Sequence, residues 1–294
     1  MVSFRSPASH AGHVMKSLQG DTLRSVGTVR NYEQALTRVA EWAQQERVEG
    51  GLKGMTPELA VSYLEQRGLD VGQKTRDRER QAVQCMMQNV TGTLAPGERL
   101  PIVKAETQQI LEARAYTPLQ AALIAAAQTE RNGLATEIAH AAGLRAHELH
   151  TLRRGDERAP DLRPALDSKF RGRDGEIYTV QGKGGLVREV LIPRELAARL
   201  EEHRRDEPVR ITDRGVHYQS AYDINGGNRW SSSVTNAAER VLGWSTGAHG
   251  LRHSYAQERM YELQHNGLRR DEALETVSQE MGHFRPEITE TYLR

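Results

Sequence analysis

A stretch that breaks the helical periodicity divides this sequence and constrains its fold more than any other feature. From Gly92 to Tyr116 the chain contains Pro96, Gly97 and Pro101 and has only weak periodicity, which is typical of a linker. On both sides of this stretch, apolar residues recur at steps of three and four, as they do on one face of a helix. We therefore predict a flexible tail, a first domain, a linker and a second domain at residues 1–19, 20–95, 96–116 and 117–294.

The first domain is predicted to be entirely helical. Thr56 and Pro57 mark the start of one helix, because threonine caps a helix N-terminus and proline fits the first helical position. We expect this helix to end at Gly68. Helical patterns also precede it, from near Thr22, and follow it over residues 73–90.

The second domain is predicted to be mostly helical with a small antiparallel sheet. Two β-rich runs, 176–181 and 186–192, are separated by a glycine-rich break around Lys183, which is the signal of a β-hairpin. Residues 206–230 contain Gly226 and Gly227 and are predicted to be irregular. Helical patterns cover 118–131, 133–142, 194–204, 231–241, 249–265, 270–281 and 286–293. The fold class is therefore mainly α, with a helical first domain and a mixed α/β second domain.

Composition excludes several classes of protein. The sequence has no run of 18 apolar residues, so we expect no membrane span, and its first residues lack the apolar core of a signal peptide. Its single cysteine, Cys85, can form neither an internal disulfide nor a zinc cluster, which favours the reducing cytoplasm. The net charge is only +1, so a nucleic-acid partner would require basic residues gathered on one face.

Residues with chemical potential occur in four separate pieces of the second domain. Arg145 and Glu148 lie in the first piece, Lys183 in the glycine-rich break, His249 and Arg252 in the third piece, and His283 and Tyr292 near the end. Each has an ordinary structural explanation when taken alone. An arginine is usually solvated, a histidine or tyrosine usually packs, and a lysine in a glycine-rich turn usually keeps the turn soluble.

Together these residue types form a set suited to phosphoryl transfer. Arginine gives bidentate contacts to phosphate oxygens and stays charged, so two arginines can replace the metal ions that many phosphoryl-transfer enzymes use. A tyrosine hydroxyl can attack phosphorus and hold the phosphate as a covalent ester. Lysine can protonate the leaving oxygen as a general acid. We expect no cofactor and no metal ligand set.

The order Arg145, Lys183, His249, Arg252, His283, Tyr292 resembles the tyrosine recombinase (phage integrase) family. The surrounding segments AAGLRAHEL, HGLRHSYA and MGHFRPEITETYL are similar to the boxes of that family. The resemblance is strong over residues 117–294. Residues 20–95 resemble the core-binding domain of the family only in general pattern.

The resemblance implies a role for each residue. Arg145 and Arg252 would bind the non-bridging oxygens of the scissile phosphate, and His249 and His283 would hydrogen-bond the phosphate and assist proton transfer. Lys183 would be the general acid, Tyr292 the nucleophile, and Glu148 the acidic residue that supports the site. Glu148 also lies at i+3 from Arg145, where an ordinary surface ion pair is the alternative.

The function implied is a site-specific recombinase or integrase that cleaves and rejoins DNA through a covalent 3′-phosphotyrosine. It would integrate, excise or resolve a mobile element or replicon. The implied partners are double-stranded DNA with specific recombination sites, further copies of the chain (a dimer per site and a tetramer in synapsis) and an accessory DNA-bending protein. The protein would be cytoplasmic and associated with the nucleoid when bound to DNA.

Four alternatives compete with this interpretation. A type IB topoisomerase would use the same cleavage chemistry to relax DNA without exchanging strands, and a DNA-binding regulator with a recombinase fold would not cleave at all. His147 and His150 resemble part of a zinc-protease motif, but they are three residues apart where that motif needs four. The break around Lys183 lacks the spacing and the following helix of a nucleotide-binding phosphate loop.

The basic helix of residues 73–90 supplies candidate DNA contacts, namely Lys74, Arg76, Arg78 and Arg80. The alternative is a solvated helix face with internal salt bridges. Two features depart from the family pattern. The net charge is nearly neutral, and only Leu293 and Arg294 follow Tyr292, where many members carry a tail helix that docks on a neighbouring protomer. We expect the protomers to be coupled by another element or to be coupled more weakly.

Overall fold

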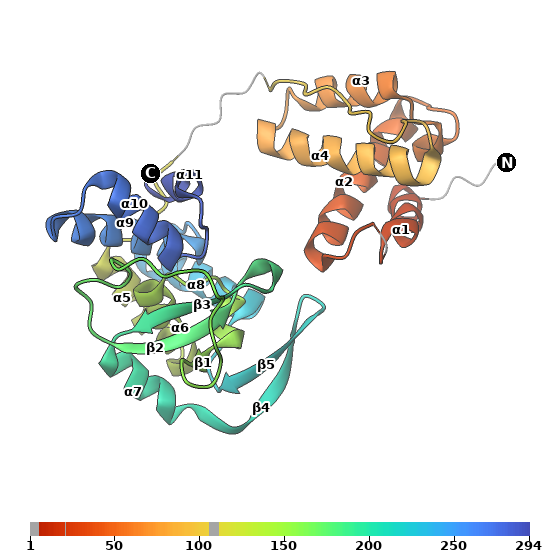
Figure 1. Cartoon of the computed structure of the whole chain (residues 1–294). Coiled ribbons are helices and arrows are strands. Elements are labelled where there is room, and N and C mark those ends of the chain that lie inside the picture. The colour runs from red at the N-terminus through yellow and green to blue at the C-terminus, as the bar shows by residue number, and fades with distance from the viewer. Residues whose placement is uncertain (1–5, 21, 106–111) are drawn as a thin grey trace. The chain divides into compact units, whose positions relative to one another are not determined.

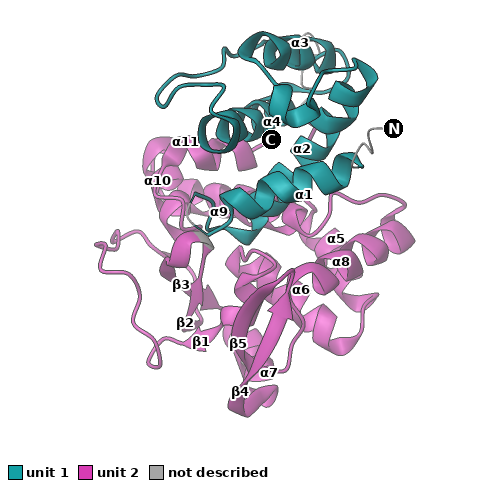
Figure 2. Cartoon of the chain, turned by 90° about the vertical axis from the view of Figure 1, so that its right-hand side faces the viewer, with its two compact units in different colours: residues 1–110 teal, residues 111–294 magenta. Residues whose placement is uncertain are grey.

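The computed structural model describes residues 6–20, 22–105 and 112–294. The chain forms two compact units, residues 1–110 and residues 111–294, shown in different colours in Figure 2. Within the described ranges, no helix combines the length and the apolar character needed to cross a membrane.

The first unit is entirely helical in its described residues, as predicted (Figure 1). Thr56 begins α3 as expected, because its side chain accepts a hydrogen bond from the Leu59 N–H at 3.3 Å and proline follows it. The helix ends before Gly68, also as predicted. The elements of this unit are α1 (Pro7–Leu18), α2 (Val26–Gln45), the short turn η1 (Gly51–Gly54), α3 (Pro57–Arg67), α4 (Gln73–Met86) and the π-turn η2 (Met87–Thr91).

The first helix is a correction to the sequence analysis, in which residues 1–19 are a tail. Ser6 caps α1 by accepting a hydrogen bond from the Ser9 N–H at 3.3 Å. Ala11, Val14 and Leu18 are buried against the other helices of the unit. Because only this narrow stripe is apolar and histidines, serines and a lysine separate its members, the pattern is too weak to recognise from the sequence.

The second unit begins with two helices and the predicted hairpin. Strands β2 and β3 pair antiparallel, with Gln181 opposite Val187 across the glycine-rich turn, so the hairpin prediction is confirmed. Strand β1 adds to the other side of β2 to give the order β1-β2-β3. The elements are α5 (Pro118–Ala126), α6 (Glu130–Ala142), η3 (Glu148–Thr151), β1 (Arg153–Arg154), β2 (Glu176–Gln181), η4 (Lys183–Gly185), β3 (Val187–Ile192) and α7 (Arg194–Glu202).

A second hairpin occupies residues that were predicted to be irregular. Strands β4 (Arg204–Asp213) and β5 (Val216–Tyr222) pair antiparallel, and α8 (Gly227–Leu242) follows. Most of β4 is exposed, so it does not alternate between apolar and polar residues and gives no strand signal. The turn itself has positive φ at Arg214 and Gly215, the geometry that favours tight hairpins.

The last elements are α9 (His249–His265), α10 (Arg270–Glu280), α11 (Pro286–Thr289) and η5 (Glu290–Tyr292). They lie together at one end of the second unit (Figure 1). Helix α6 packs against α9 and also against β3, so it joins the helical end of the unit to the sheet. The chain leaves α6 at Gly143, whose φ of 60° lies in the left-handed region. A Cβ there would lie 2.6 Å from Tyr255 Cδ1, so glycine meets both a conformational and a steric requirement.

Candidate functional site

Four segments of the second unit bring their polar side chains together. They are the loop after α6, strand β3, the start of α9 and the segment after α10. The loop after α6 carries Arg145 and Glu148, and α9 carries His249 and Arg252. A cavity of about 400 Å³ lies beside them. Its lining includes Arg145, Glu148, Gly182, Gly184, Arg188 and His283.

Glu148 organises the first of these groups. It is fully buried and accepts hydrogen bonds from the Arg145 backbone N–H at 2.8 Å and from Arg145 Nη1 at 2.9 Å. Arg188 Nη2 donates to Oε2, the oxygen that also accepts from the Arg145 N–H, at 2.9 Å. Burial alone would raise the pKa of Glu148, but the charges of Arg188, Arg252 and Arg145 outweigh this effect and hold the pKa well below its usual range. Glu148 is therefore a buried carboxylate that orients Arg145, and not a surface ion pair.

Arg252 lies on the buried side of the site. Its side chain is completely buried, and its guanidinium donates to the backbone oxygens of Gly143 and Met281, the latter at 2.5 Å. Its Nη2 also lies 3.0 Å from His283 Nε2. Burial, together with the charge of Arg145, lowers the pKa of Arg252 to about 10, so it remains charged at neutral pH. The charge of Arg252 is thus held in a fixed place by backbone carbonyls.

The ring of Tyr292 lies among histidines and over Arg252. Its centroid is 5.4 Å from that of His249, 4.8 Å from that of His253 and 5.0 Å from that of His283. The guanidinium carbon of Arg252 lies 5.6 Å from the same centroid. The structure therefore brings Tyr292, His249, Arg252 and His283 together.

His253 is not among the predicted site residues, although it follows Arg252 directly. It is buried and lies against the Tyr292 ring, whereas the Tyr292 carbonyl accepts a hydrogen bond from Gln257 Nε2 at 3.1 Å. Its only signal in the sequence is its place one helical turn after His249, which puts both rings on one face of α9. His253 thus packs against the Tyr292 ring, and Gln257 of the same helix hydrogen-bonds the Tyr292 backbone.

The three histidines share an environment that opposes protonation. Burial is the main cause for each, and neighbouring arginines add to it. The pKa falls to about 4 for His249, to about 4 for His253 and to about 3 for His283. At neutral pH all three are uncharged, so each has one ring nitrogen able to accept a hydrogen bond or a proton.

These pKa shifts predict acid sensitivity. Unfolding would return His249, His253 and His283 to an ordinary pKa near 6.5, so the unfolded chain takes up protons that the folded chain does not hold. We expect the free energy of unfolding to be at its full value above pH 6.5 and to fall as the pH drops toward about 4. Urea denaturation at intervals between about pH 7.5 and pH 5 measures this slope.

The matched variant is His283→Asn, which removes one titrating group and should reduce the slope by about one proton. A slope that is unchanged in this variant would mean that folding does not lower the pKa of His283.

Lys183 lies in the turn η4, where Gly184 and Gly185 have φ values of 82° and 87°. The side chain of Lys183 lies outside the described part of the structure. The turn backbone is near the other residues, since a Cβ on Gly182 would lie 3.3 Å from Glu148 Oε1. The hairpin therefore brings the turn that carries Lys183 to the cavity.

The four candidate DNA contacts on α4 divide into two pairs. Lys74 and Arg78 are exposed. Arg76 is a correction, because it is only 2% exposed and packs under Gly68, where it cannot reach DNA in this conformation. Arg80 is largely covered and donates to the Leu100 carbonyl at 3.2 Å. One face of α4 thus serves the core of the unit, and only the other face is free for a ligand.

No group of three or more histidine, cysteine or carboxylate side chains that could hold a metal ion occurs in residues 6–20, 22–105 and 112–294. The charge at the site comes from arginine. Arg145, Arg188 and Arg252 surround the single carboxylate of Glu148, which leaves an excess of positive charge. Such an excess suits an anion, and the bidentate geometry of arginine suits a phosphate.

Comparison with solved structures identifies the fold. The XerH site-specific recombinase bound to palindromic difH substrate aligns with a TM-score of 0.57 and 13% identity, over 99% of this chain and 94% of that one. A lambda integrase tetramer bound to a Holliday junction aligns with a TM-score of 0.58 and 14% identity, over 99% of this chain and 78% of that one. The Tn1549 transposon integrase aligns with a TM-score of 0.50 and 13% identity, over 99% and 95%. No family sequence model and no curated protein sequence matches the chain.

Proposed function

Because this chain has the fold of the tyrosine recombinases, we propose that it is a site-specific DNA recombinase or integrase that acts through a covalent 3′-phosphotyrosine. One observation carries the proposal. The Tyr292 ring lies among three histidines and over a buried arginine; α9 supplies His249, His253 and Arg252, and the segment after α10 supplies His283. A tyrosine that only filled the core would not require this polar surrounding.

The charge of the site supports attack on a phosphodiester. The transition state carries negative charge on the non-bridging oxygens, and fixed arginines stabilise it without reorganising. Arg145, whose side chain is 24% exposed, is available to these oxygens directly. Arg252 is fully buried and lies against one face of the Tyr292 ring, so in this conformation it stabilises the phosphate by its charge and not by contact. A direct hydrogen bond to phosphate requires the ring to move aside.

The reaction then follows in two phosphoryl-transfer steps, strand cleavage and strand rejoining. The Tyr292 oxygen attacks phosphorus as its proton passes to a neutral histidine, and the bond to the 5′-oxygen breaks. Lys183 donates a proton to that leaving 5′-oxygen, and His249 and His283 hydrogen-bond the phosphate. Attack by a 5′-hydroxyl of a second strand reverses these steps and frees Tyr292. The phosphotyrosine ester retains the bond energy, so rejoining needs no ATP.

The proposed partners are double-stranded DNA with specific recombination sites and further copies of this chain. The solved relatives of this fold include a lambda integrase dimer on a core site and a tetramer on a Holliday junction, which supports a dimer per site and a tetramer in synapsis. Lys74 and Arg78 are the residues of α4 that we assign to the DNA backbone. An accessory DNA-bending protein and location in the cytoplasm, with the nucleoid, complete the proposal.

A plasmid with two recombination sites tests this function. Sites are first identified in the DNA flanking the coding gene, where inverted repeats are sought. Recombinant products would support the proposal. Relaxed plasmid without recombinants, obtained on any sequence, would assign the chain to a type IB topoisomerase activity. Binding without any cleavage would assign it to a regulator.

We expect cleavage to proceed fully in EDTA, because Arg145, Arg188 and Arg252 supply the positive charge that metal ions supply elsewhere. The measurement is the yield of covalent adduct on a nicked suicide substrate with EDTA and with added magnesium. The two yields should agree within about twofold when ionic strength is matched and the protein is in saturating excess, since DNA binding itself depends strongly on salt. Strict dependence on magnesium would point to a metal-assisted nuclease.

A further inference from the structure

Arg188 is a buried arginine on β3 to which the proposed chemistry assigns no contact with the phosphate, beyond its contribution to the positive charge of the site. It is only 4% exposed and is directed into the unit from the strand that follows the Lys183 turn. Its guanidinium reaches three acceptors on two different segments, the loop after α6 and the end of α10. Nη2 donates to Glu148 Oε2 at 2.9 Å and lies 3.4 Å from the Gly143 carbonyl, and Nη1 donates to the Glu280 carbonyl at 2.6 Å.

Each of these acceptors belongs to a segment that carries a site residue. Glu148 holds Arg145 through its other oxygen, at 2.9 Å. The Glu280 carbonyl ends α10, three residues before His283. Arg188 therefore joins the strand after the Lys183 turn, the loop that holds Arg145 and the helix end that leads to His283. A planar guanidinium can satisfy acceptors in fixed directions at once, which a lysine cannot.

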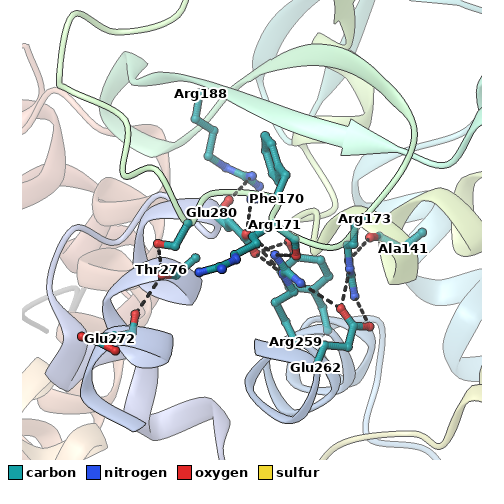
Figure 3. A network of polar contacts seen from close by, with 12 residues as sticks. Ala141, Phe170, Arg171, Arg173, Arg188, Arg259, Glu262, Glu272, Thr276 and Glu280 are labelled. Carbon is teal, nitrogen blue, oxygen red and sulfur yellow. Dashed lines mark hydrogen bonds and ion pairs between the residues drawn. The ribbon is translucent and has the colours of Figure 1, made fainter. Parts of the chain in front are cut away.

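Glu280, whose carbonyl Arg188 binds at the end of α10, is itself held by several hydrogen bonds (Figure 3). The Glu280 carboxylate is fully buried and accepts hydrogen bonds from Arg259 Nε at 3.0 Å, from the Tyr255 hydroxyl at 2.8 Å and from the Phe170 N–H at 2.8 Å. Arg259 thus contacts the carboxylate of Glu280, whereas Arg188 contacts its backbone carbonyl. The two arginines are buried equally well, but only Arg188 reaches Glu148.

We propose that Arg188 is a positioning residue for the phosphate-binding arginine: it holds the Glu148 carboxylate against α10 so that Arg145 is fixed before the phosphate arrives. This inference rests on the proposed strand cleavage. A buried carboxylate with Arg145 as its only partner would follow the partly exposed Arg145 side chain as it moves. Arg188 is the second partner of the Glu148 carboxylate and is itself bonded to the end of α10. The carboxylate therefore has a fixed position, and the Arg145 side chain that it binds is fixed as well.

The test compares Arg188→Lys with Arg259→Lys. Both variants keep a buried positive charge beside Glu280 and lose the guanidinium fork, but only the first removes contacts with Glu148. Each is assayed for adduct formation on a suicide DNA with an ordinary scissile phosphate and on one with a methylphosphonate there. The methylphosphonate lacks one charged oxygen, so its reaction depends less on a correctly placed arginine.

For Arg188→Lys we expect the rate on the ordinary phosphate to fall roughly thirtyfold, within the range that misplacement by about 1 Å can cause. The rate on the methylphosphonate should change by no more than about threefold. Arg259→Lys should alter both rates by the same factor. A general packing defect slows both substrates equally, so an unchanged ratio in Arg188→Lys, or the same change of ratio in Arg259→Lys, would overturn the proposal.

A measurement without DNA separates this inference from the proposed function. The guanidinium NMR signals of Arg145, assigned with Arg145→Lys, should be protected from exchange in the wild type and in Arg259→Lys, and lost in Arg188→Lys. Protected Arg145 signals in Arg188→Lys would refute the positioning role even if the wild type never cleaves DNA. If the lysine variant does not fold, Arg188→Gln replaces it, because its amide can still donate to the Glu280 carbonyl.

Discussion

Replacing Tyr292 by phenylalanine is expected to abolish the covalent protein–DNA adduct completely. The change removes only the hydroxyl that would attack phosphorus. The ring contacts with His249, His253 and His283 remain, and so does the packing over Arg252. Folding and DNA binding should therefore be retained. The measurement is the amount of labelled suicide substrate that migrates with the protein under denaturing conditions, with thermal unfolding and DNA binding measured in parallel.

Tyr261→Phe is the matched control, since Tyr261 lies on the same helix as the site histidines but is 65% exposed. It should form the adduct as the wild type does. Tyr255 is the other tyrosine of α9, and burial raises the pKa of its hydroxyl, which also donates to Glu280. An adduct that survives in Tyr292→Phe, or that maps to Tyr255 or Tyr261, would remove Tyr292 from the role of nucleophile.

The second large effect is expected for Lys183→Ala. If Lys183 protonates the leaving 5′-oxygen, the variant should cleave ordinary DNA roughly a hundredfold more slowly, the usual contribution of general acid catalysis. Gly184 and Gly185 permit the turn its left-handed backbone, and this turn lies on the cavity that Arg145 lines. The rate of adduct formation in a single turnover measures the loss.

A substrate with sulfur at the 5′-bridging position identifies the cause of that loss. A thiolate leaves without a proton, so Lys183→Ala should cleave this substrate at nearly the wild-type rate. Arg145→Ala and Arg252→Ala should impair both substrates, because the phosphate charge needs stabilisation in either case. Equal slowing of both substrates by Lys183→Ala would instead make Lys183 a contact to phosphate or DNA backbone.

No slowing of either substrate would require another acid, which would be Lys169 or a histidine. Lys169 is the other lysine that the sequence offers for this role. In the structure its Nζ pairs with Glu189 Oε2 at 2.7 Å and its side chain is only 11% exposed, so it is engaged elsewhere. Lys169→Ala is therefore expected to leave the ratio of the two cleavage rates unchanged.

Local chemistry explains which elements could be predicted. The cap at Thr56 and the glycine-rich turn around Lys183 depend on neighbouring residues alone, and both formed as expected. Helix α1 and the β4–β5 hairpin were missed because their apolar patterns are sparse, so their stability comes from contacts that the sequence does not display. Helix and strand propensity and apolar periodicity describe a segment by itself. They do not show which distant segments pack against it.

The same division applies to the basic residues of α4. The sequence does not distinguish Lys74, Arg76 and Arg78, because each carries a positive charge on the same predicted helix. The structure buries Arg76 under Gly68 and leaves Lys74 and Arg78 exposed. Which of these charges can meet a ligand depends on how the helices pack, because a long side chain can cover a neighbouring backbone as well as extend into solvent.

The sequence by itself determined which residues are candidates for the site and their order, because each box is a short segment whose residue types carry the chemistry. Residue type and order along the chain, with the resemblance to the tyrosine recombinases, are the basis on which Arg145, His249, Arg252 and Tyr292 are proposed. Only the tertiary structure decided that Arg188 belongs with them, since it lies 40 residues from Glu148 and meets it across the hairpin. A buried charge is stabilised by partners that the fold brings from distant segments, and spacing along the chain does not record those partners.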